Sequence, residues 1–172
     1  MNVTISYLLG IIALVIWTLS IQVKEKKKIL QAQIIANLFF AGQYILIDAV
    51  AAGIMNIVSA IRCYVFTKEE EKHKQISVIW LFIFVTIILC VAVVTCREFI
   101  SLIPIAITII YTYASWQKDT KVIRILFLLA ACAWIYYNAY VGAYVAIIGN
   151  ILDICSSIVS IFRFDKKKII DR

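Results

Sequence analysis

The sequence predicts an all-α membrane protein with seven transmembrane helices, arranged as two parallel triple-helix bundles joined by a linker helix (3+1+3). Of the 172 residues, 64% are hydrophobic and 16% are charged, whereas soluble domains are about half apolar and about a quarter charged. The charges cluster between apolar segments of roughly the 20 residues that a helix needs to cross a bilayer. In addition, the order of apolar segments and loops repeats along the chain.

The first three predicted helices are separated by a lysine cluster and by a tight turn. Residues 5–23 form an apolar segment that ends at the lysine cluster, and residues 29–47 form a second one that ends at Asp48. The third segment, residues 49–66, precedes the charged stretch 68–74. Because the basic cluster follows the first segment and no small-residue cleavage site is present, we expect a helix there and not a cleaved signal peptide.

The remaining chain supplies four more predicted helices. Residues 76–96 contain no charge and form the clearest segment, and residues 99–116 follow after Arg97 and Glu98. The last apolar stretch, residues 122–164, is about twice the length of one span. Gly142 lies near its middle, and we expect the stretch to divide there into a sixth and a seventh helix.

The distribution of basic residues predicts the orientation in the membrane. Cytoplasmic ends of transmembrane helices carry the excess of Lys and Arg. With the N-terminus outside, every one of the 17 basic residues except Arg97 falls at a cytoplasmic end. We therefore expect a multi-pass protein of the bacterial inner (plasma) membrane, with its N-terminus outside and its C-terminus in the cytoplasm.

The net charge and the cysteines exclude several classes of function. A charge of +7 in a soluble protein would indicate nucleic acid, but at helix ends it indicates contact with anionic lipid, so we expect no nucleic-acid partner. The five cysteines show no C-x-x-C spacing or clustering with His, and so predict neither a disulfide framework nor a metal site. No nucleotide-binding motif or Ser-His-Asp set is present. We expect no cofactor and no enzymatic activity.

A duplication of three helices accounts for the loop pattern. At a gapless offset of 97 residues, Lys24 aligns with Lys121, and residues 53–61 align with residues 150–158. An odd helix between the copies gives both the same orientation, as in parallel-repeat transporters. The expected organisation is a first triple-helix bundle over residues 1–68, a loop and linker helix over 69–97, a second bundle over 98–164 and a basic cytoplasmic tail over 165–172.

Short motifs in four predicted helices resemble a known family. They are Leu102-Ile103-Pro104-Ile105, Cys132-Ala133-Trp134-Ile135-Tyr136-Tyr137-Asn138, Ala60-Ile61-Arg62 and, at the end of the seventh helix, Ile161-Phe162-Arg163-Phe164. On these motifs the chain resembles the YgjV-like bacterial inner-membrane proteins, which are distantly similar to SWEET/PQ-loop sugar transporters and PnuC vitamin transporters. The resemblance implies two triple-helix bundles without fixing a substrate. The chain departs from the PQ-loop pattern, because its one proline, Pro104, is followed by Ile105.

Asp153 is the one acidic residue deep within a predicted span, and its counterpart in the repeat is Asn56. We expect the two side chains near the bilayer midplane, facing each other across a pseudo-two-fold axis. Intramembrane acids often mark functional sites, so one interpretation is a substrate or ion site between the bundles. The alternative is a neutral acid, or one bonded to Asn56, that fixes helix packing. Near these two residues, Ser59, Ser156 and Ser160 fit close helix packing better than ligand contact.

Further candidate substrate-binding residues lie on the second and sixth helices. Asn37 aligns with Trp134 in the repeat, and Asn138 follows Trp134 by one turn. Amides beside an aromatic ring suit a polar, ring-shaped solute. Hydrogen bonding between helices is the alternative role of such amides.

Arg62, Arg124 and Arg163 lie near predicted cytoplasmic ends. We expect them to extend to the lipid headgroups. The alternative is a cytoplasmic gate or an anion-binding role, chiefly for Arg62, and Pro104 is the corresponding candidate hinge.

These predictions favour a facilitator that moves a small polar solute by alternating access between two helix bundles. The alternative is a non-transporting receptor, a lipid-binding protein or an assembly protein with the same fold, since fold does not dictate function. A channel fits less well, because the first and fifth helices carry large apolar residues. The expected partners are the phospholipid bilayer, an unknown small polar solute and a second copy of the chain in a homo-oligomer.

Overall fold

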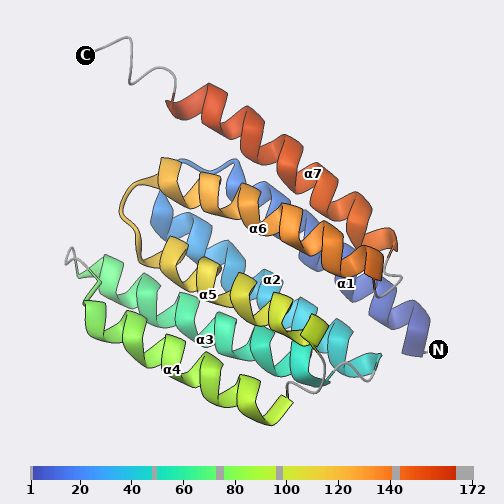
Figure 1. Cartoon of the computed structure of the whole chain (residues 1–172). Coiled ribbons are helices and arrows are strands. Elements are labelled where there is room, and N and C mark those ends of the chain that lie inside the picture. The colour runs from blue at the N-terminus through green and yellow to red at the C-terminus, as the bar shows by residue number, and fades with distance from the viewer. Residues whose placement is uncertain (1, 48–49, 73–75, 96–98, 141–143, 166–172) are drawn as a thin grey trace.

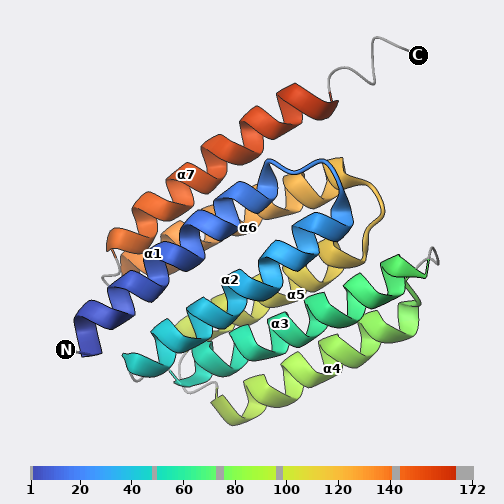
Figure 2. The same ribbon diagram turned by 180° about the vertical axis from the view of Figure 1, so that it is seen from behind.

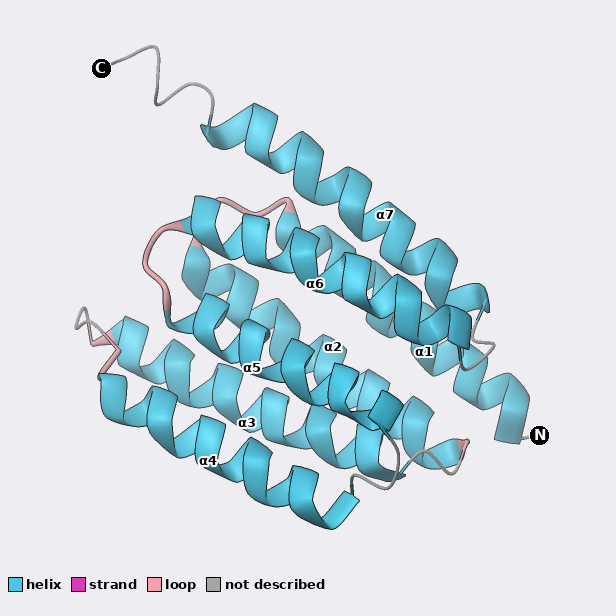
Figure 3. Cartoon of the chain, in the orientation of Figure 1, coloured by secondary structure: helices cyan, strands magenta, loops and turns pink. Residues whose placement is uncertain are grey.

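The computed structural model describes residues 2–47, 50–72, 76–95, 99–140 and 144–165. Within them the chain is helical and contains no strand (Figure 3). The described residues form seven α-helices (Figure 1), a short 3₁₀ helix η1 (Phe99–Ser101) and a π-helical turn η2 (Ile161–Asp165). The α-helices are α1 (Asn2–Ile21), α2 (Lys26–Leu46), α3 (Val50–Glu71), α4 (Val78–Thr95), α5 (Leu102–Trp116), α6 (Thr120–Tyr140) and α7 (Tyr144–Ser160).

Each apolar segment of the sequence forms one of these helices, as predicted. The long C-terminal stretch divides as expected, because α6 ends at Tyr140 and α7 begins at Tyr144. The expected break at Gly142 and the turn at Asp48 fall outside the described residues, as do residues 166–172 of the basic tail.

Helix α3 is longer than predicted, because it continues past Phe66 through the charged residues to Glu71. Lys26 Nζ lies 3.3 Å from Glu70 Oε2, and Lys27 Nζ lies 3.4 Å from Glu71 Oε1, so the start of α2 is paired with the end of α3. Lys68 also pairs with Glu71 one turn away. This hydrogen bond raises the pKa of Lys68 and lowers the pKa of Glu71. These charges therefore support an extra turn of helix instead of a loop.

The helices pack in a regular order around one central region. In sequence order α1 packs against α2 and α2 against α3, while α5 packs against α6 and α6 against α7. The two groups meet where α1 contacts α7 and where α3 contacts α5, and α4 covers α3 and α5 at one edge. Figures 1 and 2 show α5 and α6 on one side of the molecule and α1 and α2 on the other, with α7 at the edge opposite α4.

The outer surface carries the apolar side chains expected of a protein in a bilayer. Within the described residues, four segments are long and apolar enough to cross a membrane: α1, α2, α6 and the stretch Ala146–Arg163 of α7 and η2. Helices α4 and α5 are also apolar but shorter. Large apolar residues such as Phe82, Val93 and Ile148 are exposed on the surface. In water such a surface would be unstable, whereas lipid chains solvate it.

One packed cluster lies toward the end of the molecule where α1 ends and α2 begins, and consists of Trp17, Ile21, Ile29, Ala36, Ala114, Ile123 and Phe127. Phe127 stands edge-to-face with Tyr111, with ring centroids 5.3 Å apart, and Trp17 lies 5.6 Å from Phe127. We call this end of the bundle the closed half. A separate buried cluster, formed by Met55, Ile88, Ala92 and Ile105, joins α3, α4 and α5.

Candidate functional site

A cavity of about 440 Å³ lies between the helices, in the range of small-molecule sites. Six helices line it, and α4 contributes no lining residue. The lining residues fall within positions 6–17 of α1, 37–47 of α2 and its end, 52–59 of α3, 104–111 of α5, 134–138 of α6 and 146–153 of α7. Most of them lie in the halves of these helices at the N-terminal end of α1, which we call the open half, whereas Trp17 of α1 and Tyr111 of α5 lie deeper, where the cavity borders the packed core.

The rim of the cavity lies at the start of α1 and the end of α2. Tyr7 and Ile47 line the cavity there, and their side chains are 54% and 48% exposed. Ser6 donates a hydrogen bond of 3.4 Å to the carbonyl oxygen of Gln43, which joins α1 to α2 beside this rim. The cavity therefore reaches the molecular surface beside these residues.

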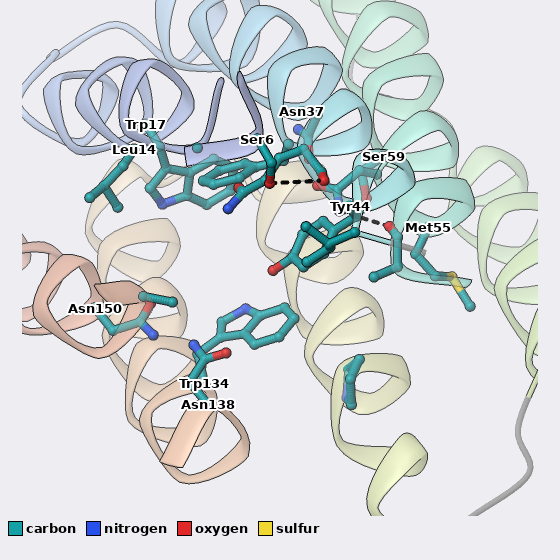
Figure 4. Close-up of a pocket in the computed structure, with 18 of the residues that line it drawn as sticks. Ser6, Leu14, Trp17, Asn37, Tyr44, Met55, Ser59, Trp134, Asn138 and Asn150 are labelled. Carbon is teal, nitrogen blue, oxygen red and sulfur yellow. Dashed lines mark hydrogen bonds between the residues drawn. The ribbon is translucent and has the colours of Figure 1, made fainter. Parts of the chain in front are cut away.

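All five residues predicted to bind a substrate line this cavity. They are Asn37, Asn56, Trp134, Asn138 and Asp153, and the candidate hinge Pro104 lines it as well. In Figure 4, Trp134 and Asn138 extend from α6, and Asn150 from α7, toward Trp17 and Tyr44 on the opposite side. The tertiary structure thus brings together residues that were selected from four separate helices.

Asp153 and Asn56 line the same cavity but do not bond to each other among the described side chains. Asp153 Oδ1 accepts a hydrogen bond from the Thr18 hydroxyl of α1. Asn56 Nδ2 donates to the Ala52 carbonyl oxygen within α3, at 2.8 Å. The alternative of an Asp153–Asn56 bond that fixes packing is therefore wrong. A side chain of α1, which the sequence did not single out, holds the carboxyl group.

The interface between α1 and α7 is polar on both sides of Thr18. Gln22 Nε2 donates to the Ser156 hydroxyl at 2.7 Å and to the Ser156 carbonyl oxygen at 2.8 Å. Ser160 donates to the Ile21 carbonyl oxygen at 3.1 Å. Ser156 and Ser160 therefore join helices, whereas Ser59, the counterpart of Ser156 in the repeat, lines the cavity.

The prediction that Arg62 and Arg124 extend to the headgroups is wrong. Each side chain is 1% exposed. Arg62 Nη1 donates to the Thr112 hydroxyl at 2.8 Å and to the Thr108 carbonyl oxygen at 3.4 Å, both on α5. These acceptors, which the sequence did not reveal, hold the guanidinium inside the bundle. Arg62 does not line the cavity. Arg163, in contrast, is exposed.

Two cations join the two helix groups across the closed half. Arg124, at the start of α6, donates from Nη2 to the Val23 carbonyl oxygen at 3.2 Å, just beyond α1. Lys26, at the start of α2, donates from Nζ to the Trp116 carbonyl oxygen at 3.4 Å, at the end of α5. The last carbonyl groups of a helix lack partners in the helix and attract cations. A cation from each group of helices therefore bonds to a carbonyl oxygen at or just beyond the end of a helix in the other group.

Several lining residues were not predicted. Tyr111, Thr108 and Trp17 lie on α5 and α1, which the sequence suggested were merely apolar. The spacing Pro104, Thr108, Tyr111 follows one face of a helix, and this periodicity was the signal that could have revealed them.

Among the described residues, no group of three or more His, Cys, Asp or Glu side chains could hold a metal ion. Cys63 is buried, while Cys90, Cys132 and Cys155 are exposed on the apolar surface. His73 and Cys96 lie outside the described residues. The chemistry available in the cavity is therefore that of amides, hydroxyls, aromatic rings and one carboxyl group.

A comparison with family models found a match over residues 4–168, to the Imp-YgjV family, described as a bacterial inner membrane protein. The chain belongs to the Imp-YgjV family. The predicted resemblance to YgjV-like proteins is thereby confirmed, and an inner-membrane location agrees with the apolar helices. Comparisons with curated proteins and with solved structures found no match. The similarity to SWEET and PnuC transporters thus stays a prediction.

Proposed function

We propose that this Imp-YgjV protein is a transporter that moves a small polar solute across the inner membrane by alternating access between two three-helix bundles, α1–α3 and α5–α7. The observation that carries the proposal is the cavity itself. It reaches the surface beside Tyr7 and Ile47 at one end of the bundle, and Trp17 and Tyr111 of its lining also border the packed aromatic and aliphatic core of the closed half. A channel would need a continuous polar path, whereas a cavity sealed at one end is one of the two states that alternating access requires.

The duplication inferred from the sequence is supported by the cavity lining. Five pairs of lining residues are 97 positions apart: Tyr7 and Pro104, Ile11 and Thr108, Leu14 and Tyr111, Asn37 and Trp134, and Asn56 and Asp153. Under a two-fold relation of the bundles, the contact of α1 with α7 corresponds to that of α5 with α3, and both contacts occur. The Lys26 and Arg124 bonds are reciprocal in the same way. The cavity then lies on the symmetry axis, and α4 links the copies.

The solute would occupy the open half, in contact with Asn37, Asn56, Trp134, Asn138 and Asp153. The amides provide both donors and acceptors, and Trp134 provides a flat apolar surface, which together suit a polar, ring-shaped molecule. The protein would bind and release this molecule unchanged. On release to the other side, the contacts of α1 with α7 and of α3 with α5 would rearrange, with Pro104 as hinge and Arg62 as part of the gate.

The orientation in this proposal follows from the distribution of Lys and Arg. All seven helices span the inner membrane, the open half faces outward, and the closed half and the C-terminus face the cytoplasm. The exposed lysines at this end, such as Lys27, Lys28 and Lys72, then meet anionic lipid headgroups.

Thiol labelling tests the mechanism without knowledge of the solute. In a variant that lacks the five native cysteines, Ser59→Cys places a thiol in the cavity and Ala114→Cys places one in the sealed core. We expect a membrane-impermeant methanethiosulfonate to label Ser59→Cys in intact cells. In inverted vesicles it should label Ala114→Cys slowly, as the closed half opens. Ala114→Cys that stays unreactive from both sides would indicate a static receptor or lipid-binding protein and would contradict the proposal.

A solute can be identified by thermal stabilisation of the detergent-purified protein in a screen of sugars, nucleosides, vitamins and amino acids, because a bound ligand raises stability by mass action. Uptake of that solute should be abolished by Asp153→Ala combined with Asn56→Ala, while membrane insertion is unchanged. Full uptake by the double variant would show that the site is assigned wrongly.

A further inference from the structure

The charge of the cavity indicates what kind of solute it accepts. Asp153 is the one carboxylic acid among the 23 lining residues, and none of the 23 is Lys, Arg or His. Its side chain is buried, with 6% exposed. No ion pair to Asp153 occurs among the described residues, whose ion pairs all lie at the charged helix ends. A buried carboxylate without a counter-charge is unfavourable, so a positively charged solute would stabilise the ionised form of Asp153.

Aromatic rings form a large part of the lining of the cavity that holds this carboxyl group. Six of the lining residues are aromatic: Tyr7, Trp17, Phe40, Tyr44, Tyr111 and Trp134. Trp17 and Tyr111 meet edge-to-face with ring centroids 5.2 Å apart. Trp134 and Tyr44 extend into the cavity from opposite walls (Figure 4). The faces of aromatic rings attract cations, and the attraction is strongest when water is excluded.

One polar atom near Asp153 has no hydrogen-bond partner among the described residues. The Nδ2 atom of Asn150, one turn before Asp153 on α7, is buried and has no hydrogen-bond partner in the described part of the chain. A buried donor without an acceptor is costly, so a solute with an oxygen or nitrogen acceptor would satisfy it.

We propose that the transported solute is an organic cation, a quaternary ammonium or cationic ring compound whose positive charge pairs with Asp153 between aromatic rings. This inference rests on the proposed function, because it concerns the solute of the same cavity. An anionic solute would meet an acid and no cation among the lining residues. Arg62, the buried cation of α3, is bonded to Thr112 and Thr108 behind the cavity wall, and so does not complete an anion site.

Matched probes that differ in charge and share their shape test this inference. Choline and 3,3-dimethylbutan-1-ol form one such pair, and 1-methylpyridinium and pyridine at pH 8 form another. We expect the full-length protein in nanodiscs to bind at least one cation about tenfold or more tightly than its neutral counterpart, as measured by calorimetry, because cation–aromatic and charge pairing act together.

Asp153→Asn keeps the shape of the side chain and removes its charge, and it should abolish the preference for the cation. Trp134→Leu should weaken cation binding severalfold. The control is Asp119→Asn, which neutralises an acid outside the cavity and retains the oxygen that accepts the backbone N–H of Lys121. This variant should bind the cation as wild type does.

Equal binding of cation and neutral probe, an unchanged preference in Asp153→Asn, or no binding of either cation at millimolar concentration would each overturn the inference. None of these results would alter the thiol labelling of Ser59→Cys and Ala114→Cys. Failure of the cation class is therefore distinguishable from failure of the transport mechanism.

Discussion

The open and closed halves of the molecule are built from the same six helices, yet they differ in what lies between them. In the open half the helices are separated by a cavity lined with amides, hydroxyls, aromatic rings and one carboxyl group. In the closed half α1, α2, α5 and α6 meet through Ile21, Ile29 and Phe127, and the cations Lys26 and Arg124 bond to carbonyl oxygens near helix ends. The two halves therefore differ in the side chains that lie between the helices.

Both halves contain buried polar groups, and their bonds differ. In the open half, the amides of Asn37 and Asn56 bond within their own helices and Asn150 Nδ2 has no partner in the described residues. In the closed half, the buried cations Arg62 and Arg124 bond to oxygen atoms of a neighbouring helix or of the chain just beyond it. Bonds from one helix to another thus hold the buried cations of the closed half.

The largest expected effect is on the free energy of unfolding. It should distinguish two aromatic residues of α6, Phe127 and Trp134, which lie two turns apart, one in each half. Phe127→Ala removes a ring that is 3% exposed in the sealed core, and should lower the free energy of unfolding by roughly 3–5 kcal/mol. Trp134→Ala should cost clearly less, because its ring already borders the cavity. Denaturant unfolding in detergent measures both, and equal losses would contradict the distinction between the halves.

A smaller loss of unfolding free energy should distinguish two threonines of α5, Thr108 and Thr112, which lie one turn apart. Thr112→Val removes the hydroxyl that accepts from Arg62 at 2.8 Å, and should lower the free energy of unfolding by roughly 1.5–3 kcal/mol because a charged donor loses its partner. Thr108→Val is the control, since Arg62 uses only the backbone oxygen of Thr108, whose hydroxyl bonds to Pro104 within α5. The same unfolding assay applies. A Thr108→Val variant as unstable as Thr112→Val would rule out the assigned role of Arg62.

The smallest effect concerns the cations that join the two bundles in the closed half. Arg124→Met removes a bond of 3.2 Å to the Val23 carbonyl oxygen, and Lys26→Met removes one of 3.4 Å to that of Trp116. Each loss should favour opening of the closed half by about 1.4 kcal/mol, or about tenfold. The measurement is the labelling rate of Ala114→Cys in inverted vesicles.

Lys28→Met provides the matched control for these cations, because Lys28 pairs with Glu25 at the surface and contacts neither α5 nor α6 through that bond. Its labelling rate should equal that of the parent variant. Unchanged labelling in Arg124→Met would mean that the cations do not hold the closed half together.

The sequence alone determined the number of helices, their approximate bounds and five residues of the cavity lining, Asn37, Asn56, Trp134, Asn138 and Asp153. This was possible because a bilayer demands apolar segments of one length separated by charge, so that Asn37, Asn56 and Asp153 stand out as exceptions within them. The end of α3 was predicted less well, since its continuation to Glu71 depends on Lys26 and Lys27 of another helix.

Only the tertiary structure decided how those residues are used. It placed Thr18 beside Asp153, turned Arg62 and Arg124 inward, and added Tyr111 to the cavity wall. Hydropathy and spacing are local properties, which report that a side chain is polar and which face of a helix it shares. The partner of a buried group lies on a different helix far away in sequence, and packing alone brings the two together.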